Sequence, residues 1–106
     1  MIASTPQTPY YAVIFTALRT EGDNGYGPMS DTMVDLAKQQ PGYLGYESAR
    51  NEIGITVSYW ESLEAIKNWK ANLDHQMAQK LGREKWYTQY KVRICKVERD
   101  YGFEAK

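Results

Sequence analysis

Four short runs of hydrophobic residues along the chain predict β-strands. They cover residues 10–18, 43–50, 53–59 and 90–101. The first run is β-branched and aromatic and too short for a typical helix. A turn is expected at Asn51-Glu52, and a bulge near Cys95, where the alternation of apolar positions shifts. Both faces of the first run are apolar, which is typical of a strand that is buried on both sides.

Two segments between these runs carry hydrophobic residues at helical spacing. They are Met29, Met33, Leu36 and Ala37 in the first segment, and Leu63, Ile66, Trp69 and Leu73 in the second. Ser30 or Asp31 is the expected N-cap of the first helix, and Ser62 that of the second. Asn72–Asp74 is expected to interrupt the second helix, which then resumes toward Trp86.

The resulting order, β-α-β-β-α-β, predicts a ferredoxin-like α+β domain with both helices on one face of an antiparallel sheet. Residues 10–106 form this single domain, and residues 1–9 are a loose lead-in. A first strand that is apolar on both faces needs a second cover. A second copy of the sheet supplies one, so we expect a homodimer. The alternative is a monomer with scattered apolar surface.

Charge and composition remove several functional classes. The 13 basic and 13 acidic side chains balance, whereas duplex nucleic acid is held mainly through a basic surplus. The longest apolar run, residues 10–18, is far shorter than the roughly 20 residues that span a bilayer as a helix. Residues 1–9 lack a signal-peptide profile. We therefore expect a cytoplasmic protein that binds neither nucleic acid nor membranes.

The sequence also lacks the side chains that a metal site or an internal disulfide would need. One cysteine, Cys95, and one histidine, His75, give no internal disulfide and no zinc or iron–sulfur ligand set. Phosphate-binding glycine loops, nucleophile elbows and zinc-binding helices are absent as motifs. We expect a protein without a metal.

His75 is the side chain whose ordinary pKa lies near neutral pH. In a cavity it is a candidate general base or haem ligand; otherwise it is a surface residue of a helix. Trp69 precedes it by six positions, about 240° around a straight helix. The two share a pocket only if the helix breaks at Asn72–Asp74. Arg93, which faces away from Val92 and Ile94 on its strand, is either a stabiliser of a developing oxyanion or a solvated residue.

Aromatic residues make up 13% of the chain, and such rings suit both interfaces and cavity walls. Tyr43, Tyr46 and Tyr59 line either a pocket or a dimer interface. We predict that Trp69, Tyr59, Phe15 and Tyr46 contact the substrate, with His75 and Arg93 as catalytic residues.

Two stretches, Pro41–Glu47 (PGYLGYE) and Ile55–Trp69 (ITVSYWESLEAIKNW), resemble the antibiotic biosynthesis monooxygenase family. Residues 75–87 and 90–101 look like a bacterial subgroup of it. The resemblance implies a dimeric α+β barrel with one cavity per subunit, between sheet and helices. It also implies oxygenation of an aromatic substrate without metal, flavin or nicotinamide. There the substrate anion gives an electron to O2, and the radicals recombine to a peroxide that collapses to a quinone.

The resemblance also bears on single residues. Trp69 matches an aromatic position on the second helix that lines the cavity in family members. His75 falls where some members have a polar aromatic residue or a histidine. The haem-degrading branch pairs a helical histidine with a tryptophan and an asparagine on the first strand. Here the first strand has no asparagine, and the spacing from Trp69 to His75 is shorter.

The function we predict is a cofactor-independent monooxygenase that oxidises a small aromatic or quinol-type molecule with O2. In it, His75 is the base, Trp69 a cavity wall and Arg93 the partner of the substrate anion. Two alternatives remain. One is a haem-binding or haem-degrading monooxygenase with His75 as the ligand, and the other is a non-catalytic dimeric protein that binds small molecules.

Overall fold

One antiparallel sheet, in the strand order β2-β3-β1-β4, forms the centre of the molecule. The structure is a computed structural model that describes residues 1–23, 25–75 and 82–105, and only the backbone of residues 74, 75, 82 and 83. The strands are β1 (Tyr10–Arg19), β2 (Tyr43–Arg50), β3 (Gly54–Trp60) and β4 (Tyr87–Val97). The two longest strands, β1 and β4, pair beside each other, as do β1 and β3.

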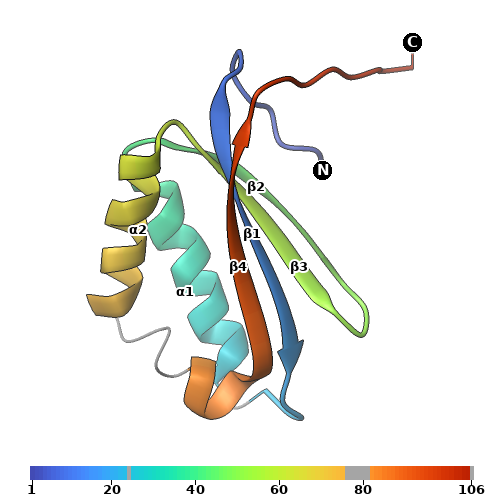
Figure 1. Cartoon of the computed structure of the whole chain (residues 1–106). Helices are drawn as coiled ribbons and strands as arrows, with labels where there is room; N and C mark the ends of the chain where they lie inside the picture. The colour runs from blue at the N-terminus through green and yellow to red at the C-terminus, as the bar shows by residue number, and fades with distance from the viewer. Residues whose placement is uncertain (24, 76–81, 106) are drawn as a thin grey trace.

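Two α-helices cover one face of this sheet (Figure 1). They are α1 (Tyr26–Lys38) and α2 (Leu63–His75), and a π-helical turn, η1 (Gly82–Trp86), leads into β4. The order of elements confirms the predicted β-α-β-β-α-β arrangement. Both chain termini lie on the side of the sheet away from the helices (Figure 1). Within the described residues, no helix is long and apolar enough to cross a membrane.

Helix α1 begins earlier than the sequence predicted. Its N-cap is Gly25, in the left-handed region, and not Ser30 or Asp31. The carboxylate of Asp23 explains the early start, because it accepts hydrogen bonds from the backbone N–H groups of Gly25 (3.1 Å) and Gly27 (2.9 Å). These groups lie at a helix start, where backbone donors lack partners within the helix.

Helix α2 confirms one prediction and contradicts another. Ser62 caps it, since its hydroxyl accepts a hydrogen bond from the Ala65 N–H at 3.1 Å. The break expected at Asn72–Asp74 is wrong, because the helix continues through this segment to His75. The predicted continuation through residues 76–81 lies outside the described residues. Leu63 is 56% exposed and does not belong to the buried stripe.

Strand β4 pairs with β1 without a bulge at Cys95, so that prediction was also wrong. The irregularity lies instead at Leu18 and Arg19, opposite Gln89 and Tyr87. Cys95 pairs with the buried residue Ala12 on one face, whereas its neighbour Ile94 lies on the other. Apolar residues on both faces therefore produced a pattern that resembled a shift of register.

The core joins the sheet to α2 around Trp60, which is fully buried. Ala65 and Ile66 of α2 pack against it. Gly42 holds the adjoining turn close to α2: its carbonyl accepts a hydrogen bond from the Glu61 N–H at 2.8 Å. A Cβ atom at Gly42 would lie 2.6 Å from the Cβ of Ala65, and the φ of Gly42 is +86°. Glycine is therefore required at this point of close approach.

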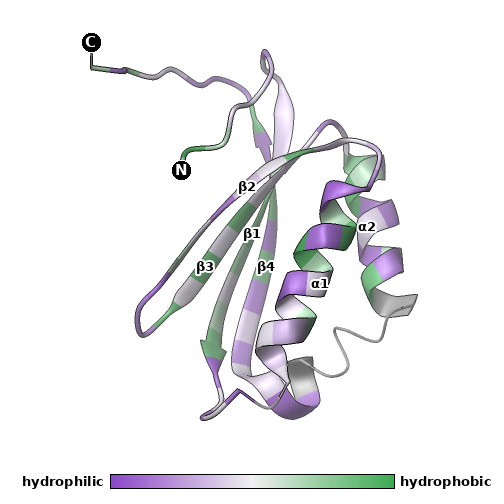
Figure 2. Cartoon of the chain, turned by 180° about the vertical axis from the view of Figure 1, so that it is seen from behind, coloured by the Kyte–Doolittle hydropathy of each residue, from purple (hydrophilic) through white to green (hydrophobic). Residues whose placement is uncertain are grey.

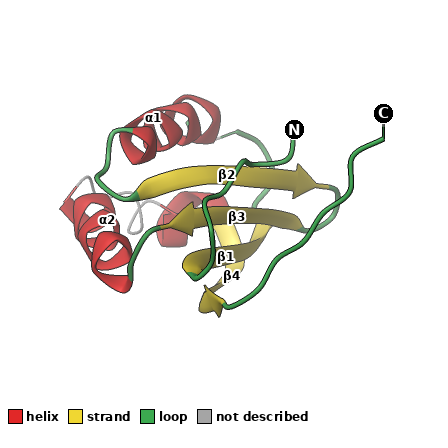
Figure 3. Ribbon diagram, turned by 90° about the horizontal axis from the view of Figure 1, so that it is seen from above, coloured by secondary structure: helices red, strands yellow, loops and turns green. Residues whose placement is uncertain are grey.

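The face of the sheet away from the helices, here called the open face, carries both polar and apolar side chains. Hydrophobic segments lie along β1 and β3 (Figure 2). The N-terminal segment passes over this side of the sheet (Figure 3). The Ala3 N–H donates a hydrogen bond to Glu47 at 2.9 Å, and the Tyr10 hydroxyl donates one to Asp100 at 2.6 Å. Part of the open face is thus covered by the chain's own terminal segments.

Candidate functional site

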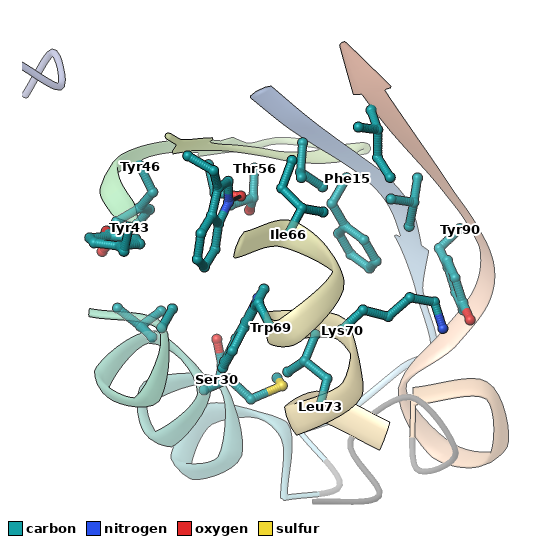
Figure 4. Close-up of a pocket in the computed structure, with 18 of the residues that line it drawn as sticks. Phe15, Ser30, Tyr43, Tyr46, Thr56, Ile66, Trp69, Lys70, Leu73 and Tyr90 are labelled. Atoms are coloured by element: carbon teal, nitrogen blue, oxygen red, sulfur yellow. Dashed lines mark hydrogen bonds between the residues drawn. The ribbon is translucent and has the colours of Figure 1, made fainter. Parts of the chain in front are cut away.

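A cavity of about 430 Å³ lies between the helix-covered face of the sheet and the two α-helices. Figure 4 shows its side chains converging from α1, α2 and the strands. Such a volume falls within the range of about 300–1,000 Å³ that is typical of small-molecule sites. The cavity expected between the sheet and the helices is therefore present, and both α1 and α2 line it.

Aromatic side chains dominate the described lining of this cavity. They are Phe15, Tyr26, Tyr43, Tyr46, Trp60, Trp69, Trp86, Tyr87 and Tyr90. Aliphatic residues and Met33 fill most of the remaining wall. Flat, polarizable rings of this kind provide large contact areas for another ring.

Strand alternation decides which side chains reach the cavity. Phe15 of β1 lies between Thr56 of β3 and Val92 of β4 in the pairing register, and all three line the cavity. Val13 lies two residues earlier on the same face, paired with Ser58 and Ile94. Successive side chains of a strand point to opposite faces. The residues between these therefore belong to the open face.

The rings form two groups on opposite sides of the cavity (Figure 4). In the first, Trp60 stacks on Trp69 with ring centroids 6.1 Å apart, and Tyr43 meets Trp60 edge-on at 5.5 Å. In the second, Phe15 contacts Tyr90 at 5.5 Å. Both groups are fixed by ring contacts of their own, so a flat ligand finds preformed walls.

A pair of half-buried tyrosines, Tyr26 and Tyr87, extends the second group. Burial, followed by a hydrogen bond with Tyr26, raises the pKa of Tyr87 above its ordinary value. The Arg19 guanidinium lies 3.6 Å from the centroid of the Tyr26 ring. Trp86, only 2% exposed, meets Tyr26 edge-on at 5.7 Å. These contacts hold Tyr87 as a neutral phenol in the cavity wall.

Polar groups in the described lining are few. They are the hydroxyls of Ser30, Thr56 and Ser58, and the ammonium of Lys70, besides the tyrosine hydroxyls. Ser58 accepts a hydrogen bond from the Trp60 indole N–H at 2.9 Å. The Lys70 side chain extends across the cavity toward Tyr90 (Figure 4). Lys70 is the one formally charged side chain among the described lining residues.

Lys70 was missed by the sequence reasoning, although the sequence carries a sign of it. Position 70 follows Ile66 by four residues and precedes Leu73 by three. It therefore falls on the apolar face of α2. A lysine on this face can reach the cavity while the residue as a whole stays exposed.

Three of the predicted site residues, Phe15, Tyr46 and Trp69, line the cavity, as does Tyr43. Tyr59 and Arg93 are not among its lining residues, so their predicted roles at the substrate stay predictions without support from this cavity. Arg93 lies between the two cavity residues Val92 and Ile94, so its side chain belongs to the open face. Tyr59 likewise lies between Ser58 and Trp60.

On the open face, Tyr59 forms a hydrogen bond with a carboxylate. Its hydroxyl donates to Glu47 at 2.5 Å. Burial and this bond raise the pKa of Tyr59 to about 12. The bond from Tyr59, together with the one from the Ala3 N–H, lowers the pKa of Glu47. This pair holds the N-terminal segment to the sheet and does not face the cavity.

The side chain of His75 lies outside the described residues, so its role as base or ligand remains a prediction. The continuous α2 removes the break that was expected to direct His75 toward Trp69. In the part of the chain that the structure describes, no three His, Cys, Asp or Glu residues gather as a metal-ligand set.

Three known proteins are similar to this chain, one in sequence and two in fold. The protein YqjZ of Bacillus subtilis (strain 168) is 49% identical over 105 residues, covering 97% of this chain and 92% of its own. Protein SO0527 of Shewanella oneidensis has a similar fold, with a TM-score of 0.71 at 11% identity over 86% of this chain and 93% of that one. A mutant of MhuD, solved with two manganese protoporphyrin IX molecules per active site, gives a TM-score of 0.63 at 22% identity over 88% of this chain and 99% of that one.

The family comparison agrees with the fold and covers most of the chain. The model of the antibiotic biosynthesis monooxygenase family matches residues 9–81. This range contains β1, both α-helices, β2 and β3, and hence most elements that build the cavity. The chain therefore belongs to the antibiotic biosynthesis monooxygenase family.

Proposed function

We propose that this protein binds a small aromatic or quinol-type molecule in the cavity and oxidises it with O2 without a cofactor. The observation that carries the proposal is the pair of aromatic walls, Trp60 with Trp69 and Phe15 with Tyr90, facing a volume of about 430 Å³. Membership of the monooxygenase family supports the choice of reaction.

The walls suit a flat ligand because aromatic pairs prefer offset-stacked or edge-on contacts at centroid distances of about 4.5–7 Å. The rings are already held by their neighbours, so little side-chain entropy is lost on binding. A mostly apolar lining also excludes water, which favours electron transfer within a caged pair over leakage of the intermediates.

The proposed reaction converts a phenol with a free para position into a quinone and water. The phenolate transfers one electron to O2, giving a phenoxyl radical and superoxide. These combine through a new C–O bond at the para carbon, and the peroxide takes up the phenol's proton. Loss of the ring C–H proton then breaks the O–O bond. The released hydroxide and this proton form water, so one oxygen atom stays in the product.

The residue assignments change with the geometry. Trp69 is the cavity wall, as predicted from the sequence, whereas Lys70 replaces Arg93 as the cation nearest the ligand. His75 is kept as a candidate general base, since an imidazole suits proton transfer near neutral pH, although the unbroken α2 does not supply the break on which a shared pocket with Trp69 depended. Its assignment rests on residue type alone and is tested separately below.

The proposed assembly is a cytoplasmic homodimer formed through the open face. Cys95 has no disulfide partner, which suits a reducing compartment. Apolar residues of β1 and β3 on this face support burial against a second copy.

Oxygen uptake tests the function directly. Purified protein is incubated with a panel of naphthols and anthrones whose para position is free, under labelled O2, and the mass of the product is measured by mass spectrometry. We expect one labelled oxygen atom in a quinone product. Trp69→Leu should reduce turnover strongly, whereas Leu63→Ala, at an exposed position of the same helix, should not. His75→Gln should retain ligand binding and lose most uptake. Binding without any uptake across the panel would favour the non-catalytic alternative.

Haem is the second candidate, because the similar fold of MhuD holds manganese protoporphyrin. Strand β1 presents Val13 and Phe15 to the cavity and contains no asparagine. We therefore expect no stoichiometric Soret shift on addition of haemin. A stoichiometric shift that disappears in His75→Ala would establish the haem alternative instead.

A further inference from the structure

We infer that the paired hydroxyls of Tyr26 and Tyr87 are a hydrogen-bonding site for the phenolic oxygen of the ligand, and that Arg19 is the residue that positions Tyr26. The inference rests on the proposed aromatic-binding function and adds the side chains that hold the reacting group of the ligand. It comes from the contacts that Tyr26 makes at the start of α1.

The ends of two elements place the two tyrosines against each other. Tyr26 is the first residue of α1, and Tyr87 is the first residue of β4, directly after η1. Their rings meet edge-on with centroids 6.0 Å apart, and both line the cavity. Phe15, on the same aromatic wall, contacts Tyr87 at 5.4 Å. A ligand ring in this part of the cavity therefore meets phenol groups beside the apolar wall.

The hydroxyl pair has one donor that its own hydrogen bond does not use. Burial, and after it the hydrogen bond with Tyr26, raise the pKa of Tyr87, as expected where the Tyr87 hydroxyl donates and the Tyr26 oxygen accepts. A hydroxyl carries one proton and two lone pairs. Tyr26 thus keeps its own proton, and among the described residues Tyr87 is the one hydrogen-bond partner that the structure gives it. A phenolic oxygen in the cavity can accept this proton.

Arg19 holds the ring that carries the donor. Its guanidinium lies 3.6 Å from the centroid of the Tyr26 ring, and its Nη2 donates to the carbonyls of Gly22 at 3.2 Å and Asp23 at 3.5 Å. Arg19 is not among the described lining residues, so it acts on a ligand through Tyr26. Its charge opposes the rise in the pKa of Tyr87, and its field therefore extends to the hydroxyl pair. The same field favours the anionic form of a bound phenol, with which the proposed reaction begins.

The cluster also has a purely structural explanation, in which it only packs the start of α1 against β4. Both tyrosines are half-buried, so water can serve as the partner of their hydroxyls. In that case the Tyr26 hydroxyl has no influence on a bound phenol. Phenylalanine at position 26 keeps the ring and its packing but lacks the hydroxyl, so Tyr26→Phe distinguishes the two explanations.

The probe for this test is 4-nitro-1-naphthol, whose anion absorbs at a longer wavelength than its neutral form. Its nitro group blocks the para carbon, so the proposed oxidation cannot consume it. A pH titration at saturating protein gives the pKa of the bound probe. We expect Tyr26→Phe to raise this pKa by about 0.5–1 unit relative to wild type, because a hydrogen bond to the anion is stronger than one to the neutral phenol. Tyr87→Phe should raise it by less, since it removes only the bond that strengthens the Tyr26 donor. Arg19→Met should also raise it.

Arg99 and Tyr101 offer matched controls. The Arg99 guanidinium lies 5.6 Å from the centroid of the Tyr101 ring, and both residues are exposed. Arg99→Met and Tyr101→Phe make the same chemical changes away from the cavity and should leave the pKa of the bound probe at its wild-type value. Arg50, whose charge also acts on Tyr87, and Lys70, which lines the cavity, are unchanged in every variant. Their contributions therefore cancel from the comparison.

The outcomes separate the inference from the function beneath it. An unchanged pKa of the bound probe in folded Tyr26→Phe would overturn the inference and leave the aromatic-binding function standing. If circular dichroism shows that Tyr26→Phe does not fold, an unchanged pKa in Tyr87→Phe overturns it instead. A shift in Arg99→Met as large as that in Arg19→Met would reject the role of Arg19. Failure of the wild-type protein to bind the probe at millimolar concentration would overturn both the inference and the function.

Discussion

Tyr59 and Trp60 are neighbours in the sequence but serve opposite faces of the sheet. Trp60 is fully buried beneath α2 and helps to form the cavity, whereas the Tyr59 hydroxyl donates to Glu47 on the open face. This division follows from the two-residue period of a strand. One strand therefore supplies both the ligand wall and the contact that holds the N-terminal segment.

The pair of Glu47 and Tyr59 should make stability depend on pH at both ends of the range. The pKa of Glu47 is lowered from its ordinary value of 4.5, first by the Tyr59 hydroxyl and then by the Ala3 N–H. Its contribution is therefore present above about pH 4.5 and is lost as pH falls through the lower folded pKa. The pKa of Tyr59 is raised from 10.0 to about 12. Its contribution is complete below pH 10 and is lost as pH rises toward 12.

Urea unfolding at pH 3 to 7 and at pH 9 to 12 tests this expectation. Glu47→Gln should be less stable than wild type at pH 7, with a weaker loss of stability on acidification, because no carboxylate remains to be protonated there. Tyr59→Phe should lose about 0.5–1.5 kcal/mol at pH 7. An unchanged acid dependence in Glu47→Gln would show that this pair does not contribute as described.

The sequence allowed part of the site to be predicted, for reasons that individual residues make clear. Phe15 and Trp69 were found because each lies on an apolar face of its element. Tyr59 lies outside the cavity lining because β3 directs its apolar series Ile55, Val57 and Tyr59 to the open face, so the more apolar face of a strand is not always the one that the helices cover. Arg93 lies on the face opposite Val92 and Ile94, as the alternation indicated. Lys70 was missed because a charged residue on a helix is ordinarily assigned to the solvent side. The lining of the cavity shows which face of each strand the helices cover.

At the scale of elements, the turn between α1 and β2 depends on one glycine. A side chain at Gly42 meets two penalties: a left-handed backbone with φ of +86° and a Cβ that would lie 2.6 Å from that of Ala65. Gly25 meets the first penalty alone, with φ of +84° and no atom within 4 Å of its added Cβ. Comparing a substitution at Gly25 with one at Gly42 therefore separates the cost of backbone strain from that of steric overlap.

We expect Gly25→Ala to cost about 1–2 kcal/mol of unfolding free energy, the usual cost of a left-handed residue with a Cβ. Gly42→Ala should cost about 1–3 kcal/mol more, since overpacking is added. Chemical denaturation of both variants measures the difference. Equal losses would mean that the turn moves away from Ala65 without cost.

The start of α1 provides a second test at this scale. Asp23→Ala removes the carboxylate that accepts hydrogen bonds from two backbone N–H groups. This change should lower the free energy of unfolding by about 1 kcal/mol. Asp23→Asn keeps one acceptor oxygen and should cost less. Thermal and urea unfolding compare the two. A loss in Asp23→Asn as large as in Asp23→Ala would assign the effect to the charge rather than to the hydrogen bonds.

Element boundaries were harder to predict than element order. The glycines before Pro28 indicated a loop, yet proline is accepted in the first turn of a helix because the N–H it lacks has no partner there. Helix α1 therefore contains Gly27 and Pro28. Asn72–Asp74 suggested a break, but local propensity is weak beside the packing of Trp69, one turn before this segment, and of Leu73 within it. The order of the elements was predicted correctly despite these errors, because it depends on whole hydrophobic segments and not on single boundary residues.

At the scale of the whole molecule, the two faces of the sheet have different surroundings. The helices enclose the cavity, whereas the open face presents apolar residues such as Ile55, 43% exposed, beside the charged β4 residues Lys91 and Arg93. The N-terminal segment covers only part of this surface (Figure 3). In the proposed dimer, Arg93 lies at the interface between the subunits rather than in the cavity.

The proposed dimer gives the last prediction. If a second copy covers the open face, the wild-type protein elutes as a dimer in light scattering at micromolar concentration. Ile55→Lys places a charge on that face, where burial without a partner is costly, and should shift the protein toward monomer. Because Ile55 pairs with Thr16 and Ala49 at an exposed position, the fold should persist, as circular dichroism will show.

Leu63→Lys, at an exposed apolar residue of α2 on the helix side, is the matched control and should remain dimeric. A wild-type monomer would end the proposal, and so would an Ile55→Lys dimer as stable as that of Leu63→Lys, because the interface would then lie elsewhere.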